Sequence, residues 1–268
     1  STRYLETTPE KARIVGPEGT ELRRVPAAAL FDTVAEFRRF GNLFEIVSYD
    51  YWARNYGYRM PVAAEKRMER YLSDPAGRAH ALAVIEQKAR ASHTNTEEWD
   101  RLPEWQKLEL AKPFFGGGHD VVIGRRHFVD GAADTSQLAS SGTLTPLEHS
   151  WYMRLTVDAM RDLYEQNRYA KYVQVFQNWL KPAGASFDHL HKQLVAIDER
   201  SVNARLEAPK VRDNPNYYNE AAVDYAGYQN LVIAENRNAV AFAGFGHRYP
   251  ALEIWSRSSA VQPWQHTP

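Results

Sequence analysis

The alternation of hydrophobic and polar residues predicts a β-hairpin in the segment 171–198. Its first six residues, KYVQVF, alternate and are rich in β-branched and aromatic side chains, and LKPAGAS supplies the proline and glycine of a tight connection. The returning run holds His189, His191 and Gln193 at every second position. Side chains on a strand alternate between its faces, so these three are predicted to share one face. From this spacing alone, a solvated polar face remains the alternative to a functional site.

Helical periodicity predicts a long helix that begins at Thr145. Thr145–Pro146–Leu147–Glu148 has the pattern of a capping box with proline at the first helical position. A hydrophobic stripe at i, i+4 spacing follows over about five turns, which is typical of a helix that packs on a core. We expect this helix to cover one face of the sheet that contains the hairpin.

The first half of the chain is predicted from the same patterns. Residues 61–110 have helical periodicity, broken at Asp74–Pro75, and are predicted to be a helical insert. The segment 26–40 is predicted to be a helix and the segment 43–52 a strand. Residues 1–24 are polar and rich in turn-forming residues, so we expect them to wrap over the surface.

A run of three glycines precedes another predicted strand within Phe114–Phe128, FFGGGHDVVIGRRHF. Glycine allows positive φ and a close approach of the backbone to a ligand. A flexible loop is the equally simple alternative. Arg125 and Arg126 follow the strand and are cations that could meet phosphate oxygens, although paired arginines at a strand end are usually solvated.

Composition narrows the function classes. Lys plus Arg and Asp plus Glu number 33 each, so no overall field favours nucleic acid or an anionic membrane as partner. The chain has no cysteine, which excludes disulfides, thiol catalysis and a cysteine-ligated zinc site within it. No apolar run approaches the ~20 residues of a membrane helix, and no signal peptide is visible. A cytoplasmic protein is expected.

The pattern F-x-N-x5-G-x-S-x2-H-x-H-x-Q resembles the active-site segment of galactose-1-phosphate uridylyltransferases. Related nucleotidyltransferases and dinucleoside-polyphosphate phosphorylases of the histidine-triad (HIT) superfamily share it. The matched positions are Asn178, Gly184, Ser186, His189, His191 and Gln193. The G-x-H-D-V-V strand and His127 are similar to a second segment of the same family.

The resemblance implies an α+β fold, with a HIT-like antiparallel sheet and helices packed on it. Residues 1–200 would form a complete nucleotidyltransferase half that contains the insert at 61–110. Residues 201–268 would be a linker and the opening strands of a second half. No second long helix and no second HxHxQ follow, so the second repeat is expected to be truncated, either in a shortened family member or in a fragment.

The resemblance also implies an enzyme, a nucleotidyltransferase or phosphorylase with His191 as nucleophile. Attack on an α-phosphorus would leave a nucleotidyl-histidine that a second phosphate acceptor resolves, with ping-pong kinetics. Hydrolases of the superfamily have a third histidine where this chain has Gln193, and an amide is no general acid near neutral pH, which favours transfer over hydrolysis. The other catalytic and substrate-binding candidates are Gln193, Asn178, Gly184, Ser186, Asp50 and Arg125.

Zinc is the candidate cofactor. In the resembled uridylyltransferases two cysteines and two histidines hold zinc, and the histidines correspond to His127 and His189. Two histidines alone do not complete a zinc site, and the chain offers no cysteine. Leu190 stands where uridylyltransferases have proline, which weakens an assignment to galactose metabolism.

The expected partners are a nucleotide or nucleotide-sugar substrate and a second copy in a homodimer, with neither nucleic acid nor membrane. A catalytically silent nucleotide-binding protein is the first alternative, because the second repeat is cut short and the resembled family builds its site at a dimer interface with residues from both halves. A HIT-type hydrolase of dinucleoside polyphosphates is the second. A metal-dependent hydrolase would instead use His119, His127, His189 and His191, but no cluster of acidic ligands accompanies them.

Overall fold

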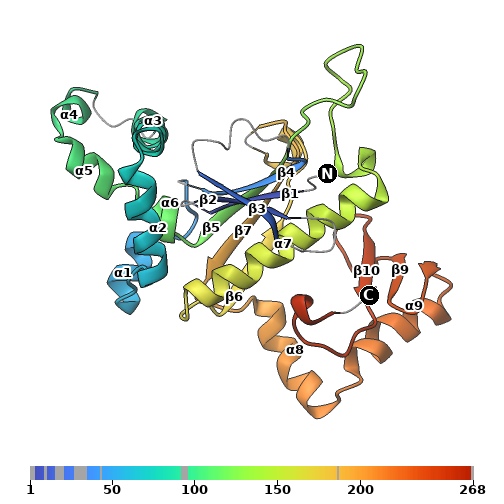
Figure 1. Cartoon of the computed structure of the whole chain (residues 1–268). Helices are drawn as coiled ribbons and strands as arrows, with labels where there is room; N and C mark the ends of the chain where they lie inside the picture. Colours follow the sequence, from blue (N-terminus) through green and yellow to red (C-terminus); the bar gives the residue numbers. More distant parts are fainter. Residues whose placement is uncertain are drawn as a thin grey trace. The chain divides into compact units, whose positions relative to one another are not determined.

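The computed structural model describes residues 4–8, 11–15, 21–26, 35–42, 44–91, 96–185 and 187–266. The chain divides into two compact units, Ser1–Glu199 and Arg200–Pro268 (Figure 1). The first unit contains a seven-stranded sheet and the second a three-stranded sheet. Each unit has its own hydrophobic core.

The large sheet has the strand order β3-β2-β1-β4-β5-β7-β6. Neighbouring strands are antiparallel except β1 and β4, which are parallel. The strands are β1 (Tyr4–Thr8), β2 (Lys11–Val15), β3 (Glu21–Pro26), β4 (Phe37–Gly41), β5 (His119–Gly124), β6 (Tyr172–Phe176) and β7 (His191–Ile197). This architecture confirms the predicted α+β class, and the parallel pair is a departure from a purely antiparallel sheet.

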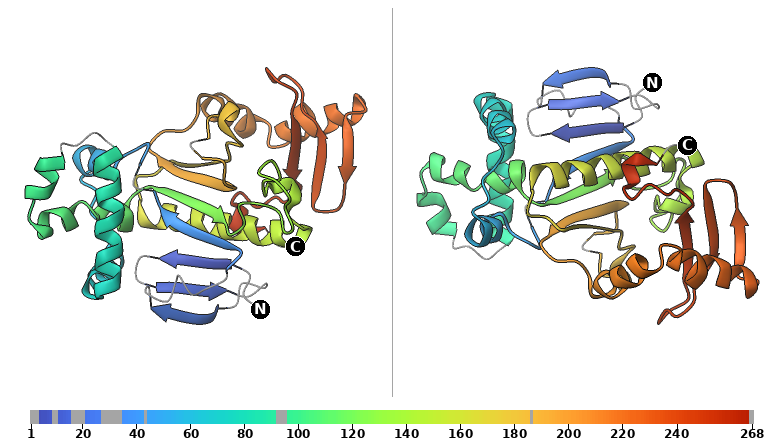
Figure 2. Two further views of the ribbon diagram at one scale, coloured as in Figure 1. Left: turned by 90° about the horizontal axis from the view of Figure 1, so that it is seen from above. Right: turned by 90° about the horizontal axis from the view of Figure 1, so that it is seen from below.

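The first 52 residues differ from the sequence-based expectation. Strands β1 to β3 form one side of the sheet (Figure 2), where a surface wrap was expected. Of the segment 26–40, residues 27–34 lie outside the described part, and Phe37 onward is strand β4, not helix. Pairing with β5 buries Phe37 and Arg39 on one face, which outweighs the local helical spacing. The strand expected at 43–52 is also wrong, because helix α1 (Tyr49–Tyr56) begins there behind the capping residue Ser48.

The segment predicted to be a helical insert is helical, and its helices continue to Gly116. It consists of α2 (Val62–Ser73), α3 (Pro75–Ala91), α4 (Thr96–Arg101), α5 (Glu104–Glu109) and α6 (Lys112–Gly116). These helices lie together at one end of the sheet (Figure 2). They enclose a core of their own, which includes Tyr71, Ile85, Trp99 and Phe115.

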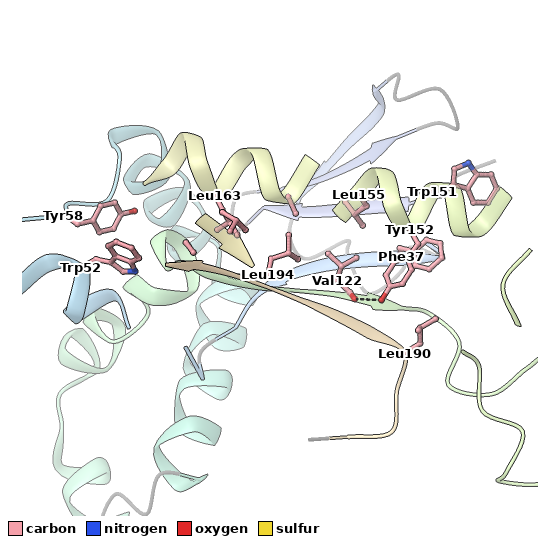
Figure 3. Packing of buried hydrophobic residues seen from close by; sticks show 13 residues of the cluster. Phe37, Trp52, Tyr58, Val122, Trp151, Tyr152, Leu155, Leu163, Leu190 and Leu194 are labelled. Carbon is pink, nitrogen blue, oxygen red and sulfur yellow. Dashed lines mark hydrogen bonds between the residues drawn. The ribbon is translucent and has the colours of Figure 1, made fainter. Parts of the chain in front are cut away.

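Helix α7 (Pro146–Gln166) lies across one face of the sheet (Figure 1). Thr145 and Glu148 form the predicted capping box at its start. Its inner side brings Tyr152, Leu155 and Leu163 against sheet residues that include Val122 and Leu194 (Figure 3). The Tyr152 hydroxyl donates a hydrogen bond of 3.3 Å to the Val122 carbonyl. The opposite face of β5 and β7 is therefore the face available for polar chemistry.

The second unit pairs three antiparallel strands with short helices. The strands are β8 (Val232–Glu235), β9 (Ala239–Ala243) and β10 (Leu252–Ser256), and the helices are α8 (Val202–Asp213), a π-helical turn (Asn219–Asp224) and α9 (Tyr225–Tyr228). A turn follows Glu235, and the Asn236 side chain accepts two backbone N–H bonds there, from Asn238 and Ala239. Short 3₁₀ turns lie at Ser141–Thr143 and Lys181–Ala183 in the first unit and at Pro263–Gln265 in the second unit. Among the residues described, no helix combines the length and apolarity needed to span a bilayer.

Candidate active site

Strands β5 and β7 bring the histidines of the two sequence motifs to one face of the sheet. The register pairs Ile123 with His191, Val121 with Gln193, and His119 with Val195. His119, His191 and Gln193 therefore share the face that α7 does not cover. The common face predicted for His191 and Gln193 is confirmed, and His119 joins it through the strand register. His189 lies one residue before Leu190, in the bend that precedes β7, so the strand begins later than expected.

His191 is held in a defined tautomer. Its Nδ1 lies 2.7 Å from the carbonyl oxygen of His189, and because a carbonyl only accepts, Nδ1 carries the proton and donates. In the neutral ring Nε2 is then unprotonated and has a free lone pair. The ring is 2% exposed, and Phe187 stacks on it with a centroid separation of 4.2 Å. This arrangement presents a nucleophilic nitrogen at a fixed position.

Phe187 was not singled out from the sequence, although it lies between Ser186 and the histidine pair. An aromatic residue two positions before the pair is the signal that could have identified it. Phe187 is itself 45% exposed, and its stacked ring covers one face of the buried His191 ring.

Gln193 is oriented by a buried histidine. His119 is 1% exposed, and its Nε2 lies 3.1 Å from Oε1 of Gln193. The backbone N–H of Ile46 points at His119 Nδ1 from 3.3 Å. Burial lowers the pKa of His119, so the ring is neutral near pH 7. Sequence analysis considered His119 only as a metal ligand and missed this contact, which depends on strand register.

His127 and His189 lie side by side, as the resemblance implies. Their rings stack at 5.0 Å with the two Nδ1 atoms 3.0 Å apart, and His189 Nε2 donates to the Gly124 carbonyl at 2.6 Å. Because Nε2 carries the proton, Nδ1 of the neutral His189 ring has a lone pair, and this lone pair faces His127. The described ranges contain no group of three or more His, Cys, Asp or Glu side chains able to hold a metal. Two nitrogen ligands do not fit a zinc site, which needs three or four, so no step below passes through a metal.

The connection between β6 and β7 contains the remaining motif residues. Gly184 ends the 3₁₀ turn with φ of 83°, a left-handed conformation that favours glycine. A Cβ at Gly184 would lie 3.8 Å from Nδ2 of Asn178, so these two positions are neighbours. Ser186 lies outside the described residues.

Asp50 and Arg125 do not join the histidines. Asp50 lies in the first turn of α1 and lines a cavity of about 460 Å³ between the start of α1 and the insert helices. The lining of this cavity contains no histidine. Arg125 donates to Glu36 through Nη2 at 3.0 Å and Nε at 3.3 Å. The Arg125 guanidinium is therefore paired with a carboxylate of the same unit, which also pairs with Arg126.

The glycine run serves close packing inside the protein. A Cβ at Gly117 would lie 2.2 Å from Oε1 of Glu45 and 2.3 Å from the Pro113 carbonyl. Gly117 has φ of −72°, so its lack of a side chain, not an unusual backbone angle, is what the site requires. Glu45 accepts N–H bonds from Tyr49 at 2.8 Å and Gly118 at 3.2 Å. Burial, only partly offset by these bonds, raises the pKa of the Glu45 carboxyl to about 7.

The chain is similar to proteins that carry nucleotidyl-transfer or phosphorylase names. The chain is 34% identical over 179 residues to an ADP-glucose phosphorylase from Arabidopsis thaliana, covering 65% of this chain and 46% of that protein. It thus spans about half the length of the curated relative it matches. The name of this relative is consistent with the resemblance to uridylyltransferase-like nucleotidyltransferases. The chain belongs to the family described as a domain of unknown function (DUF4921), whose model matches residues 1–268.

Solved structures with partial likeness carry related names. A uridylyltransferase structure has a TM-score of 0.40 and 20% identity, covering 52% of this chain and 43% of that chain. The crystal structure of an ADP-glucose phosphorylase from Arabidopsis thaliana with bound ADP-glucose has a TM-score of 0.35, covering 55% of this chain and 44% of that chain.

Proposed function

We propose that this protein is a nucleotidyltransferase that moves a nucleoside monophosphate between phosphate groups through a covalent intermediate on His191. The observation that carries the proposal is the 2.7 Å bond from His191 Nδ1 to the His189 carbonyl, because it leaves Nε2 with a lone pair. The curated relative is named ADP-glucose phosphorylase, so ADP-glucose is the first substrate to test.

The reaction is a double displacement. Nε2 of His191 forms a bond to the α-phosphorus of a nucleoside diphosphate sugar, the bond from that phosphorus to the bridging oxygen breaks, and sugar phosphate leaves with the electron pair. A phosphate oxygen then attacks the same phosphorus and the P–N bond breaks. The products are a nucleoside diphosphate and a free His191 with its lone pair restored.

The neighbouring groups support this step without acting as nucleophiles. The Gln193 amide is a hydrogen-bond donor for oxygen charge that develops on the phosphoryl group. Gly184 and Asn178 shape the connection that carries Ser186, and all three are the proposed substrate contacts. We further propose that the protein works as a homodimer, which native mass spectrometry tests directly.

Intact-mass spectrometry tests the covalent step. The protein is mixed with ADP-glucose, UDP-glucose, UDP-galactose or diadenosine tetraphosphate without a phosphate acceptor, and peptide mapping locates any adduct. We expect the mass of one AMP on His191 with ADP-glucose, and its loss when phosphate is added. His191→Ala is expected to give no adduct. His80→Phe, which alters a histidine bonded to Tyr71 in the helical insert, is expected to give the same adduct as the wild type.

Two outcomes contradict the proposal in different ways. Reversible binding of a nucleotide sugar without any adduct would identify a catalytically silent binding protein. Hydrolysis of diadenosine tetraphosphate to free nucleotides, with no transfer to phosphate, would identify a hydrolase.

A further inference from the structure

The buried ring of His119 is connected to both a backbone loop and Gln193. On one side the Ile46 N–H points at Nδ1, and on the other Nε2 lies 3.1 Å from Gln193 Oε1. A backbone N–H cannot turn away, so Nδ1 must be the unprotonated nitrogen. The neutral ring then carries its proton on Nε2 and donates it to Gln193.

The Asn42 side chain is a second neighbour of Nε2, and it offers a donor there, not an acceptor. Its Nδ2 lies 3.3 Å from His119 Nε2, while its Oδ1 accepts the Phe44 N–H at 2.9 Å. Placing the proton on Nδ1 would let Nε2 accept from Asn42, but it would set Nδ1–H against the Ile46 N–H. Two donors facing one another with no acceptor are unfavourable in a ring that is 1% exposed. The Nε2–H tautomer avoids that conflict at Nδ1. At Nε2 the proton has an acceptor, Gln193 Oε1 at 3.1 Å, and the Asn42 amide nitrogen lies farther away at 3.3 Å.

This bond decides which end of the Gln193 amide faces the site. With Oε1 fixed by His119, the amide nitrogen is directed to the other side. Within the described ranges no hydrogen-bond partner is found for that nitrogen. A flipped amide would present its oxygen to phosphoryl oxygens, which it would repel, whereas the observed orientation presents two N–H donors.

We propose that His119 is a positioning residue that fixes the Gln193 amide with its N–H groups toward the phosphoryl group transferred at His191. This inference rests on the proposed function and adds a residue to it. His119 acts through Gln193 and does not itself touch the substrate. Ile46 holds the His119 tautomer, so the loop between β4 and α1 is part of the same chain of hydrogen bonds.

Two substitutions separate the two hydrogen bonds of His119. His119→Gln places an amide nitrogen near the position of Nε2, so it keeps the donor to Gln193 and loses the acceptor for Ile46. His119→Asn places an oxygen near the position of Nδ1, so it keeps the acceptor for Ile46 and loses the donor. The pair distinguishes a role in orientation from a role in stability.

The measured quantity is the single-turnover rate of adduct formation from ADP-glucose in the full chain. We expect His119→Asn to slow adduct formation by about 10–100-fold, as for loss of a donor that stabilises developing charge. His119→Gln is expected to stay within about threefold of wild type. In a Gln193→Ala background, His119→Asn is expected to cause no further loss, because its effect passes through Gln193. His80→Asn is the matched control and is expected to leave the rate unchanged.

A spectroscopic measurement checks the tautomer independently of turnover. Nitrogen-15 shifts of the His119 ring are expected to show protonated Nε2 and unprotonated Nδ1, and Gln193→Ala is expected to move the Nε2 resonance. Protonated Nδ1 would overturn the inference. Equal rates of adduct formation for His119→Asn and His119→Gln would also overturn it. So would a full effect of His119→Asn in the Gln193→Ala background. In each of these cases the wild-type adduct would still support the proposed function. Absence of any wild-type adduct would instead overturn the proposed function, and the role of His119 with it.

Discussion

The buried carboxyl of Glu45 makes the stability of the first unit depend on pH, and Glu45→Gln is expected to remove that dependence. Glu45 accepts N–H bonds from Tyr49 and Gly118, yet burial dominates and raises its pKa from 4.5 to about 7. The folded protein therefore holds this proton more tightly than the unfolded chain. The contribution of the Glu45 carboxyl to the free energy of unfolding is greatest below about pH 4.5 and is lost as the pH rises to about 7.

The size of this pH effect follows from the difference of about 2.5 between the pKa of Glu45 in the unfolded chain, 4.5, and in the folded protein, about 7. At about 1.4 kcal/mol for each pKa unit, Glu45 lowers the free energy of unfolding by about 3 kcal/mol between about pH 4.5 and about pH 8. Glutamine does not titrate, so the variant lacks this loss. It also has one acceptor oxygen for the two N–H groups, which costs about 1 kcal/mol at every pH. The difference in slope, not the absolute stability, is the signal.

Urea unfolding of wild type and Glu45→Gln across this pH range measures the slope. A carbon-13 titration of the Glu45 carboxyl measures the pKa directly and is expected to give a midpoint near 7. Glu86→Gln is the control, because this carboxylate lies on the exposed side of α3 and pairs with Arg90. A Glu45 midpoint below about 5, or parallel stability curves for wild type and Glu45→Gln, would refute the reasoning.

Three further predictions concern the fold and the metal. Arg39→Ala is expected to lower the free energy of unfolding, measured in urea, by about 3–5 kcal/mol, because Arg39 is 6% exposed and pairs with two carboxylates, Asp120 and Asp162. A decrease below about 1 kcal/mol would be incompatible with a buried ion pair. Thr145→Ala is expected to cost about 1 kcal/mol by loss of the cap of α7, while Thr145→Ser should restore most of it. Metal analysis of the purified protein is expected to find well under one zinc per chain, since the described residues supply two nitrogen ligands. One zinc per chain that disappears in His127→Ala would show that residues outside the described ranges complete a site.

Local patterns predicted the elements whose signals lie close together in the chain. The capping box at Thr145 and the stripe behind it define α7 without reference to the rest of the molecule. The insert helices between 61 and 110 follow for the same reason, since i, i+4 contacts are local. Strand β4 was missed because Phe37 and Arg39 show their alternation only once β5 and α7 bury one face.

The sequence by itself determined which residues could carry the chemistry, because His189, His191 and Gln193 recur at the period of a strand and belong to a longer motif. Tertiary structure alone decided how they are held. The His191 tautomer depends on a carbonyl two residues away that only a particular bend brings within 2.7 Å. The orientation of Gln193 depends on His119, 74 residues earlier, which becomes its neighbour through the register of β5 and β7. Spacing along a chain fixes the face of a strand, whereas pairing between distant strands fixes which groups meet on that face.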